Sequence, residues 1–202
     1  MIESIDTLPY NLARNKIKSG DILLCSGKSE ISRMIQDATD SKWSHVAFVI
    51  WIDCVQDSSS EAMDQHLVVM ESVESIGVRM MPFMNYLKNY NGSGERYNGD
   101  LMICRHEKFD LSNVSRLVRA AYKFVGNPYN KSQLLRILEK IGMWKFGFRG
   151  EDLTYKDEFI CSEYVHECFR EIGIEIPYNR EGYIAPADYY LCSDISKMMI
   201  IS

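Results

Sequence analysis

The chain is organised around one stretch, Phe159-Ile160-Cys161-Ser162-Glu163-Tyr164-Val165-His166-Glu167-Cys168-Phe169. Its apolar residues recur at the spacing of an amphipathic helix, and Gly173 is suited to end that helix. The sequence therefore predicts a helix that begins near Cys161 and buries one face. The apolar face comprises Cys161, Tyr164, Val165, Cys168, Phe169 and Ile172, and the polar face Glu163, His166, Glu167 and Arg170.

Cys161 falls in the first turn of this predicted helix, on the side that faces the core. The first turn carries backbone N–H groups without intrahelical partners and the positive end of the helix dipole. Both favour the thiolate, which is the nucleophilic form of cysteine. Most cysteines on an apolar helix stripe are nevertheless small core residues, and this interpretation fits Cys168. For Cys161, the choice between nucleophile and core residue depends on the rest of the chain.

Length and composition indicate one globular domain over residues 1–202. The 202 residues are 46% hydrophobic, which suffices for a real core, and the net charge is −5. That charge, without a dense Lys/Arg stripe, argues against a nucleic-acid partner. The cysteines form no CxxC pair, so we expect neither a zinc site nor another cofactor. They are Cys25, Cys54, Cys104, Cys161, Cys168 and Cys192.

The sequence carries no sign of export or membrane insertion. Its N-terminus has no basic region followed by an apolar run, so we expect no signal peptide. No apolar stretch approaches the length of a membrane span, so we expect no transmembrane segment. Scattered free thiols are typical of a reducing compartment, and the expected location is therefore cytoplasmic.

The predicted elements are those of an α+β protein with a mainly antiparallel sheet, because strands cluster early and helices do not strictly alternate with them. Residues 43–52 give the strongest strand signal, apolar on both faces as in a central strand. Residues 53–66 are polar and predict a loop insertion, and residues 142–158 predict a structured loop. Further strands are predicted at 22–25, 67–71, 78–80, 101–105 and 198–201. Further helices are predicted at 4–18, 29–38, from Pro82 through Leu87, from Asp110 or Ser112 to Val125 (with Val114, Leu117, Val118, Ala121 and Val125 inward), and at 131–141, with a helical turn at Pro186.

Two of the predicted strands bring a histidine and a carboxylate together. His45 begins the strand 45–52, and Glu71 ends the strand 67–71. If these strands are antiparallel neighbours, directly opposed side chains point to the same face about 5 Å apart. A carboxylate on one ring nitrogen fixes the histidine tautomer and leaves the other nitrogen free to take a thiol proton. Cys161 at the same edge of the sheet would complete a nucleophile, a base and an orienting group.

Each of these residues also has a structural interpretation. A histidine in an apolar strand, such as His45, is more often hydrogen-bonded for structure than catalytic. Glu71 could equally mark the point where its strand reaches water. The other histidines lie in polar contexts and are expected to be solvated: His66, His106 and His166.

Four blocks of sequence resemble the permuted NlpC-type papain-like cysteine hydrolases, and more narrowly their YiiX-like branch, which is related to lecithin:retinol acyltransferase and a poxvirus protein group. The blocks follow the order that the permutation requires: histidine strand, acidic strand, tyrosine turn and cysteine helix. The resemblance covers about residues 19–190. It implies a circularly permuted papain-like fold, with a mainly antiparallel sheet or half-barrel and helices packed on one side. The blocks are Trp43-Ser44-His45-Val46-Ala47, Val69-Met70-Glu71-Ser72 with Gly77-Val78-Arg79 after it, Gly126-Asn127-Pro128-Tyr129 and Cys161-Ser162-Glu163, and Gly20-Asp21-Ile22-Leu23 matches the opening of the fold.

The resemblance also implies roles for single residues. Cys161 would be the nucleophile, His45 the general base and Glu71 the orienting residue. Tyr129 would lie beside the site, where its hydroxyl helps to hold the oxyanion together with the backbone N–H groups at the start of the cysteine helix. Relatives in this group cleave peptide amides in cell-wall fragments or move acyl groups on lipids, so the implied substrate is a small peptide or an acyl or lipid group.

The favoured function is therefore a cysteine hydrolase that works through a thioester acyl-enzyme, as a peptidase on cell-wall-type peptides or an amidase. Two alternatives stay open. One is a lipid acyltransferase or thioesterase, although no basic amphipathic helix is present to anchor it on a membrane. The other is a catalytically idle domain that binds a peptide or lipid fragment in the same cleft. The presence of Cys161, His45 and Glu71 together favours the enzyme.

Overall fold

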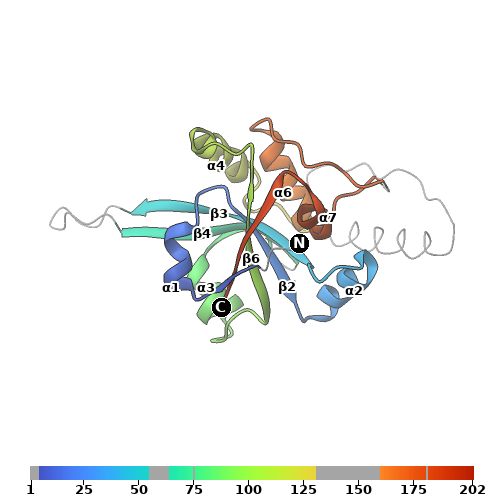
Figure 1. Ribbon diagram of the computed structural model, residues 1–202, viewed down its shortest axis with the longest axis horizontal. Coiled ribbons are helices and arrows are strands. Elements are labelled where there is room, and N and C mark those ends of the chain that lie inside the picture. Colours follow the sequence, from blue (N-terminus) through green and yellow to red (C-terminus); the bar gives the residue numbers. More distant parts are fainter. Residues whose placement is uncertain (1–4, 55–63, 75, 131–159, 181) are drawn as a thin grey trace.

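The computed structural model describes residues 5–54, 64–74, 76–130, 160–180 and 182–202 (Figure 1). Its strands form one sheet in the order β1-β7-β6-β2-β3-β4-β5, with all neighbours antiparallel except the parallel pair β1 and β7. The predicted α+β class with a mainly antiparallel sheet is confirmed. The strands are β1 (Thr7–Leu8), β2 (Ile22–Gly27), β3 (His45–Cys54), β4 (Asp64–Val73), β5 (Gly77–Pro82), β6 (Gly99–His106) and β7 (Ile195–Ile201). The α-helices are α1 (Tyr10–Ala13), α2 (Glu30–Thr39), α3 (Phe83–Lys88), α4 (Val114–Lys123), α6 (Cys161–Arg170) and α7 (Pro186–Leu191).

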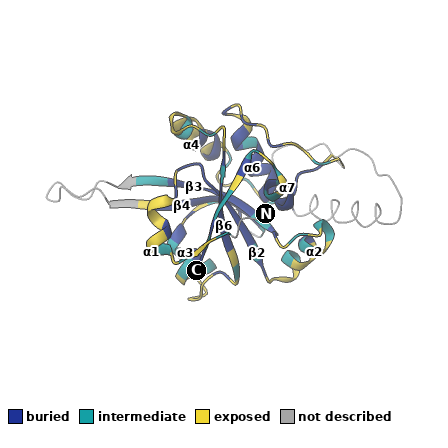
Figure 2. Cartoon of the chain, in the orientation of Figure 1, coloured by how far each residue is buried: buried dark blue, intermediate teal, exposed yellow. Residues whose placement is uncertain are grey.

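The central strands are apolar on both faces because helices cover both faces of the sheet (Figure 2). Alternation along β3 sends Val46 and Phe48 to one face and Ala47 and Val49 to the other. The first face packs against α4, α6 and α7, and the second against the short helices α1 and α3. The expected packing of helices on one side therefore holds for α4, α6 and α7. The short helices α1 and α3 cover the opposite face.

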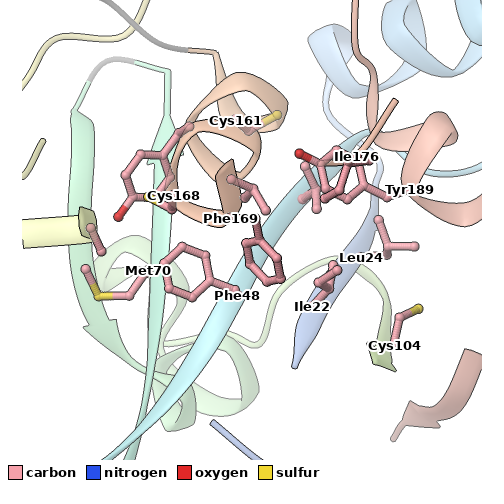
Figure 3. Close-up of a cluster of buried hydrophobic side chains, with 14 of the residues drawn as sticks. Ile22, Leu24, Phe48, Met70, Cys104, Cys161, Cys168, Phe169, Ile176 and Tyr189 are labelled. Carbon is pink, nitrogen blue, oxygen red and sulfur yellow. The ribbon is translucent and has the colours of Figure 1, made fainter. Parts of the chain in front are cut away.

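Aromatic contacts fix α6 across the sheet. Phe48 of β3 meets Tyr164 in a stacked arrangement and Phe169 edge to face, each with ring centroids 5.9 Å apart. Such pairs contribute about 0.5–1.5 kcal/mol each beyond the burial of their area. Figure 3 shows Cys161 at one end of this cluster, on the first turn of α6 and apart from Phe48. The packing that fixes α6 therefore also fixes the position of its N-terminus.

The N-terminal segment departs from the predicted helix over residues 4–18. It forms the short strand β1, then α1, and then a 3₁₀ turn at Arg14–Lys16. Pro9 is the reason, since proline disfavours a helical conformation in the residue before it and here caps α1 with an extended ψ of 147°. The residues before Pro9 pair with β7 instead.

Two predicted helix faces are also corrected. The buried face of α4 is narrower than predicted, with Val118 40% exposed and Val125, beyond the last helical residue, 42% exposed. The predicted polar face of α6 is partly buried, because the chain after the helix covers it. His166 is 5% exposed and its ring packs against Tyr178. His106 is also buried, contrary to the expectation that it is solvated, and its ring accepts a hydrogen bond from the Lys108 N–H.

Within the described ranges, no helix is both long enough and apolar enough to span a membrane. The predicted helix at 131–141 and the predicted loop at 142–158 lie outside the described residues, as does most of the loop insertion at 53–66.

Candidate active site

The thiol of Cys161 lies at the N-terminus of a helix, as predicted. Ile160 caps α6 in an extended conformation, and the N–H of Tyr164 makes the first intrahelical bond, 3.0 Å to the Ile160 carbonyl oxygen. The N–H groups of the turn before it belong to the set that lacks intrahelical acceptors. Cys161 is 4% exposed, yet it lines a cavity that opens to solvent. A nucleophile at this point faces both the cavity and the positive end of the helix dipole.

His45 connects this thiol to a buried carboxylate. It is the first residue of β3, and its Nε2 lies 2.7 Å from Oε2 of Glu71. Cys161 acts on the same ring through hydrogen bonding and charge, both of which raise the pKa of His45, and Nδ1 is the ring nitrogen that Glu71 leaves open to the thiol. Burial lowers the pKa of His45, but the hydrogen bonds and charges of Cys161 and Glu71 outweigh it and raise the pKa to about 10. The imidazole is therefore held as a cation in this arrangement.

Glu71 reaches His45 diagonally rather than from the directly opposed position that the sequence suggested. Phe48 pairs with Met70, so the same register continued by one residue sets Glu71 opposite Ala47, two residues from His45. Both side chains still point to the same face, where diagonal neighbours are within reach of long side chains. The predicted antiparallel pairing of the two strands is confirmed.

Two residues that the sequence analysis left without a role hold Glu71 in place. Arg79 donates from Nε to Oε1 at 2.8 Å, and its Nη2 lies 2.8 Å from the same oxygen as an ion pair without hydrogen-bond geometry. The Tyr86 hydroxyl donates to Oε2 at 2.5 Å. Burial raises the pKa of Glu71, but its contacts with His45, Arg79 and Tyr86 lower it below its ordinary value. The run Gly77-Val78-Arg79 in the strand after the acidic strand was the available signal, whereas nothing in the sequence links Tyr86 to Glu71.

The turn that carries Tyr129 is fixed to the edge of the sheet. Val78 of β5 donates its N–H to the Asn127 carbonyl oxygen at 2.9 Å and accepts from the Gly126 N–H at 3.0 Å. Gly77 permits this approach, because a Cβ on it would lie 2.1 Å from the same Asn127 oxygen. Tyr129 itself is half-buried and lines the cavity beside Cys161.

Tyr129 can serve as a hydrogen-bond donor toward this cavity. Burial, followed by the charges of Cys161, Glu74 and Glu163, raises its pKa well above the ordinary tyrosine value. Its hydroxyl therefore keeps its proton at neutral pH.

The cavity has a volume of about 360 Å³ and is lined by polar, aliphatic and aromatic side chains. Cys161, His45 and Tyr129 share its wall, whereas Glu71 lies behind His45 and is fully buried. The structure thus brings all the predicted site residues to one place. The other lining residues are Gly27, Lys28, Ser29, Ile31, Ser32, Ile35, Ser44, Ser72, Val73, Glu74, Tyr90, Asn91, Tyr97 and Asn98.

The remaining histidines do not join the site. His66 is exposed on β4, and His106 and His166 are buried elsewhere in the fold. Among the residues that the structure describes, no group of three or more His, Cys, Asp or Glu side chains is arranged to hold a metal ion.

Comparison with known families agrees with this geometry. The family described as permuted papain-like amidase enzymes, YaeF/YiiX, C92 family, matches residues 16–182, which is most of the chain. The chain belongs to this permuted papain-like amidase family. The branch that the sequence resembles is thereby confirmed, and so is the implied permuted papain-like fold.

A solved member of the YiiX group has a similar fold. The crystal structure described as metalloprotein yiiX from Escherichia coli O157:H7 superimposes with a TM-score of 0.57 at 18% sequence identity. The likeness covers 90% of this chain and 96% of the yiiX chain, so the two share their architecture over nearly their whole length. A search of the curated proteins returned no match.

Proposed function

We propose that this protein is a cysteine hydrolase that cleaves an amide or ester bond through a thioester acyl-enzyme. Cys161 is the nucleophile, His45 the general base and acid, and Glu71 the residue that orients His45. Membership of an amidase family supports an amide as the physiological substrate. The observation that carries the proposal is the hydrogen-bonded series Cys161–His45–Glu71, whose thiol end opens into the cavity.

The acylation step begins with the Cys161 proton on His45. The thiolate attacks the substrate carbonyl carbon, and the C–S bond forms as the carbonyl π electrons move to oxygen. The resulting oxyanion is stabilised by backbone N–H groups at the start of α6 and by the Tyr129 hydroxyl. When the intermediate collapses, the bond to the leaving amine or alcohol breaks, and His45 gives its proton to that leaving group.

The deacylation step returns the enzyme to its starting state. A water molecule gives a proton to the neutral His45 ring and attacks the thioester carbonyl. The second tetrahedral intermediate is held by the same donors and collapses with cleavage of the C–S bond. The acid product leaves, and the Cys161 thiolate and the His45 imidazolium are restored as a pair. An acceptor other than water would convert this hydrolysis into acyl transfer.

Turnover of a small activated ester and of its matching anilide tests the proposal. Cys161→Ala should abolish both reactions. Cys168→Ala, one helical turn further along the same buried face, is the matched control, because Cys168 lies in the core and burial raises its pKa far above that of a free thiol. That control should retain most of the activity. Unchanged turnover by Cys161→Ala would contradict the proposal. Binding of the anilide without any turnover by the wild-type protein would favour an idle binding domain instead.

A further inference from the structure

The carboxylate of Glu71 is more tightly held than the orientation of one histidine requires. The residue is 0% exposed, and both of its carboxylate oxygens accept hydrogen bonds. Oε2 meets the His45 ring and accepts from the Tyr86 hydroxyl, while Oε1 accepts from Nε of Arg79 and lies 2.8 Å from its Nη2. A buried carboxylate without such partners would take up a proton rather than stay charged.

We propose that Arg79 and Tyr86 are positioning residues, which keep Glu71 ionised and aimed at His45 and thereby maintain the reactive thiolate of Cys161. This inference rests on the proposed function, because it gives Glu71 the role of third catalytic group. It extends the series Cys161–His45–Glu71 from three residues to five. Neither Arg79 nor Tyr86 touches Cys161 in this scheme, and both act through Glu71.

The two positioning residues come from different elements and make different contributions. Arg79 stands directly opposite Glu71 in the pairing of β4 and β5, and its guanidinium supplies a positive charge and a two-point contact. Tyr86 comes from α3, on the face of the sheet that α1 and α3 cover, and supplies a neutral hydrogen bond. Its hydroxyl remains protonated because burial and the charge of Glu71 raise its pKa well above the ordinary value. The carboxylate is therefore fixed from two directions, with Oε2 left facing His45.

Loss of the Arg79 charge has a definite electrostatic consequence. Without the guanidinium, the buried Glu71 carboxylate protonates at higher pH, and a protonated Glu71 no longer stabilises the His45 imidazolium. The positive potential at the site also falls. Both effects disfavour the Cys161 thiolate in mildly acidic solution, so alkylation of Cys161 reports on Arg79 without any substrate.

The test measures the rate of Cys161 alkylation by iodoacetamide between pH 4 and 9 in the full-length protein. The acidic limb of this profile is the range in which the alkylation rate rises with pH. Arg79→Gln should move this limb to higher pH by about one unit, so that alkylation at pH values below the limb becomes ~10-fold slower. Arg79→Lys keeps the charge and should restore the limb, yet a single ammonium cannot replace the two-point contact, so kcat should recover only in part with KM unchanged. Tyr86→Phe should shift the limb upward by a smaller amount.

Two matched controls separate positioning from general loss of stability. Arg105 binds Asp21, a carboxylate that is 1% exposed and lies outside the cavity lining, through contacts of 2.6 and 2.8 Å. Arg105→Gln should lower the melting temperature without moving the limb. Tyr10→Phe removes a hydroxyl from the same aromatic cluster, next to Phe83, and should likewise leave the limb in place.

An unshifted limb in a folded Arg79→Gln protein would overturn the inference, and so would an equal shift in Arg105→Gln. If Arg79→Gln does not fold, Tyr86→Phe decides the question, with an unchanged limb and unchanged kcat as the contrary result. Failure of the proposed function is recognised separately, because turnover would then persist in Cys161→Ala or be absent from the wild-type protein, whatever the alkylation profiles show.

Discussion

Cys161 differs from the other buried thiols in its surroundings rather than in its depth. Cys25 and Cys104 are fully buried in the sheet, where burial raises the pKa of Cys25 well above its ordinary value and that of Cys104 to about 12. Cys161 is almost as buried, but it meets His45 and the open cavity. Sequence could place Cys161 on a helix N-terminus, and only the folded chain shows which neighbours it has there.

Selective alkylation follows from this difference. Cys161 should react first with a small alkylating agent near neutral pH, because the His45 imidazolium and the helix N-terminus favour its thiolate. Peptide mass spectrometry of partially labelled protein would identify the modified residue. Labelling of Cys25, Cys54 or Cys192 while Cys161 stays unmodified would contradict the assignment.

Substitution of Glu71 should be nearly as damaging as loss of His45. His45→Ala removes the general base, and kcat/KM should fall about 10²–10⁴-fold. Every partner of the Glu71 carboxylate is a donor, so the NH₂ of Glu71→Gln must face either Arg79 or the His45 ring. If the NH₂ group faces His45, it stabilises the wrong tautomer of the ring. The equivalent substitution in a comparable triad lowers kcat on the order of 10⁴-fold. Steady-state kinetics on the activated ester would check both, and a Glu71→Gln protein with nearly wild-type activity would argue against an orienting role.

Helices and strands were predicted correctly where no long-range pairing competed with the local sequence pattern. The helix expected at 29–38 is present as α2, with Ser29 at its N-cap, and the apolar run at 43–52 became β3. The N-terminal helix was predicted too long because the pairing of β1 with β7 competes with it, and such pairing is not encoded in local periodicity. The buried side of His166 escaped prediction for a similar reason, since a segment beyond its own helix covers it.

The cap of α2 offers a test at this scale. The Ser29 side chain accepts a hydrogen bond of 3.1 Å from the Ser32 N–H, and α2 forms part of the cavity wall. Ser29→Ala should reduce the free energy of unfolding by about 1 kcal/mol, while Ser29→Asp, an equally good cap, should preserve it. Urea denaturation of the three proteins measures the difference. Equal stability of the Ala and Asp variants would show that the cap contributes nothing.

For the whole molecule, the sequence supported the family, the order of the elements and the meeting of His45 with Glu71. The sequence did not predict the diagonal placement of Glu71 relative to His45. It also did not predict the hydrogen bonds that Arg79 and Tyr86 donate to the Glu71 carboxylate. These features depend on how three strands and α3 come together. Pairing of chain segments far apart in sequence is a property of the fold, and a single sequence shows it only through resemblance to known folds.

The charged pair at the site should make stability depend on pH in both directions. Glu71 has a lowered pKa, so its contribution is present above the unfolded value of about 4.3 and is lost as the pH falls through the folded value. His45 has a raised pKa, so its contribution is full below about 6.5 and is lost as the pH rises toward its folded pKa of about 10. The stability difference between wild type and His45→Ala should therefore shrink from pH 6.5 to pH 10. Urea titrations across this range test it, and a difference that stays constant or grows would contradict the assigned pKa shift.

Trapping of the acyl-enzyme tests the catalytic role of Cys161 without steady-state kinetics. The protein is mixed with an excess of an activated acyl ester, quenched in acid within seconds and examined by intact and peptide mass spectrometry. We predict one added acyl group, removable by neutral hydroxylamine as a thioester should be and located on Cys161. It should be absent from Cys161→Ala and strongly reduced in His45→Ala. An acyl group found on another residue, or continued turnover with no adduct in the absence of Cys161, would show that Cys161 is not the nucleophile.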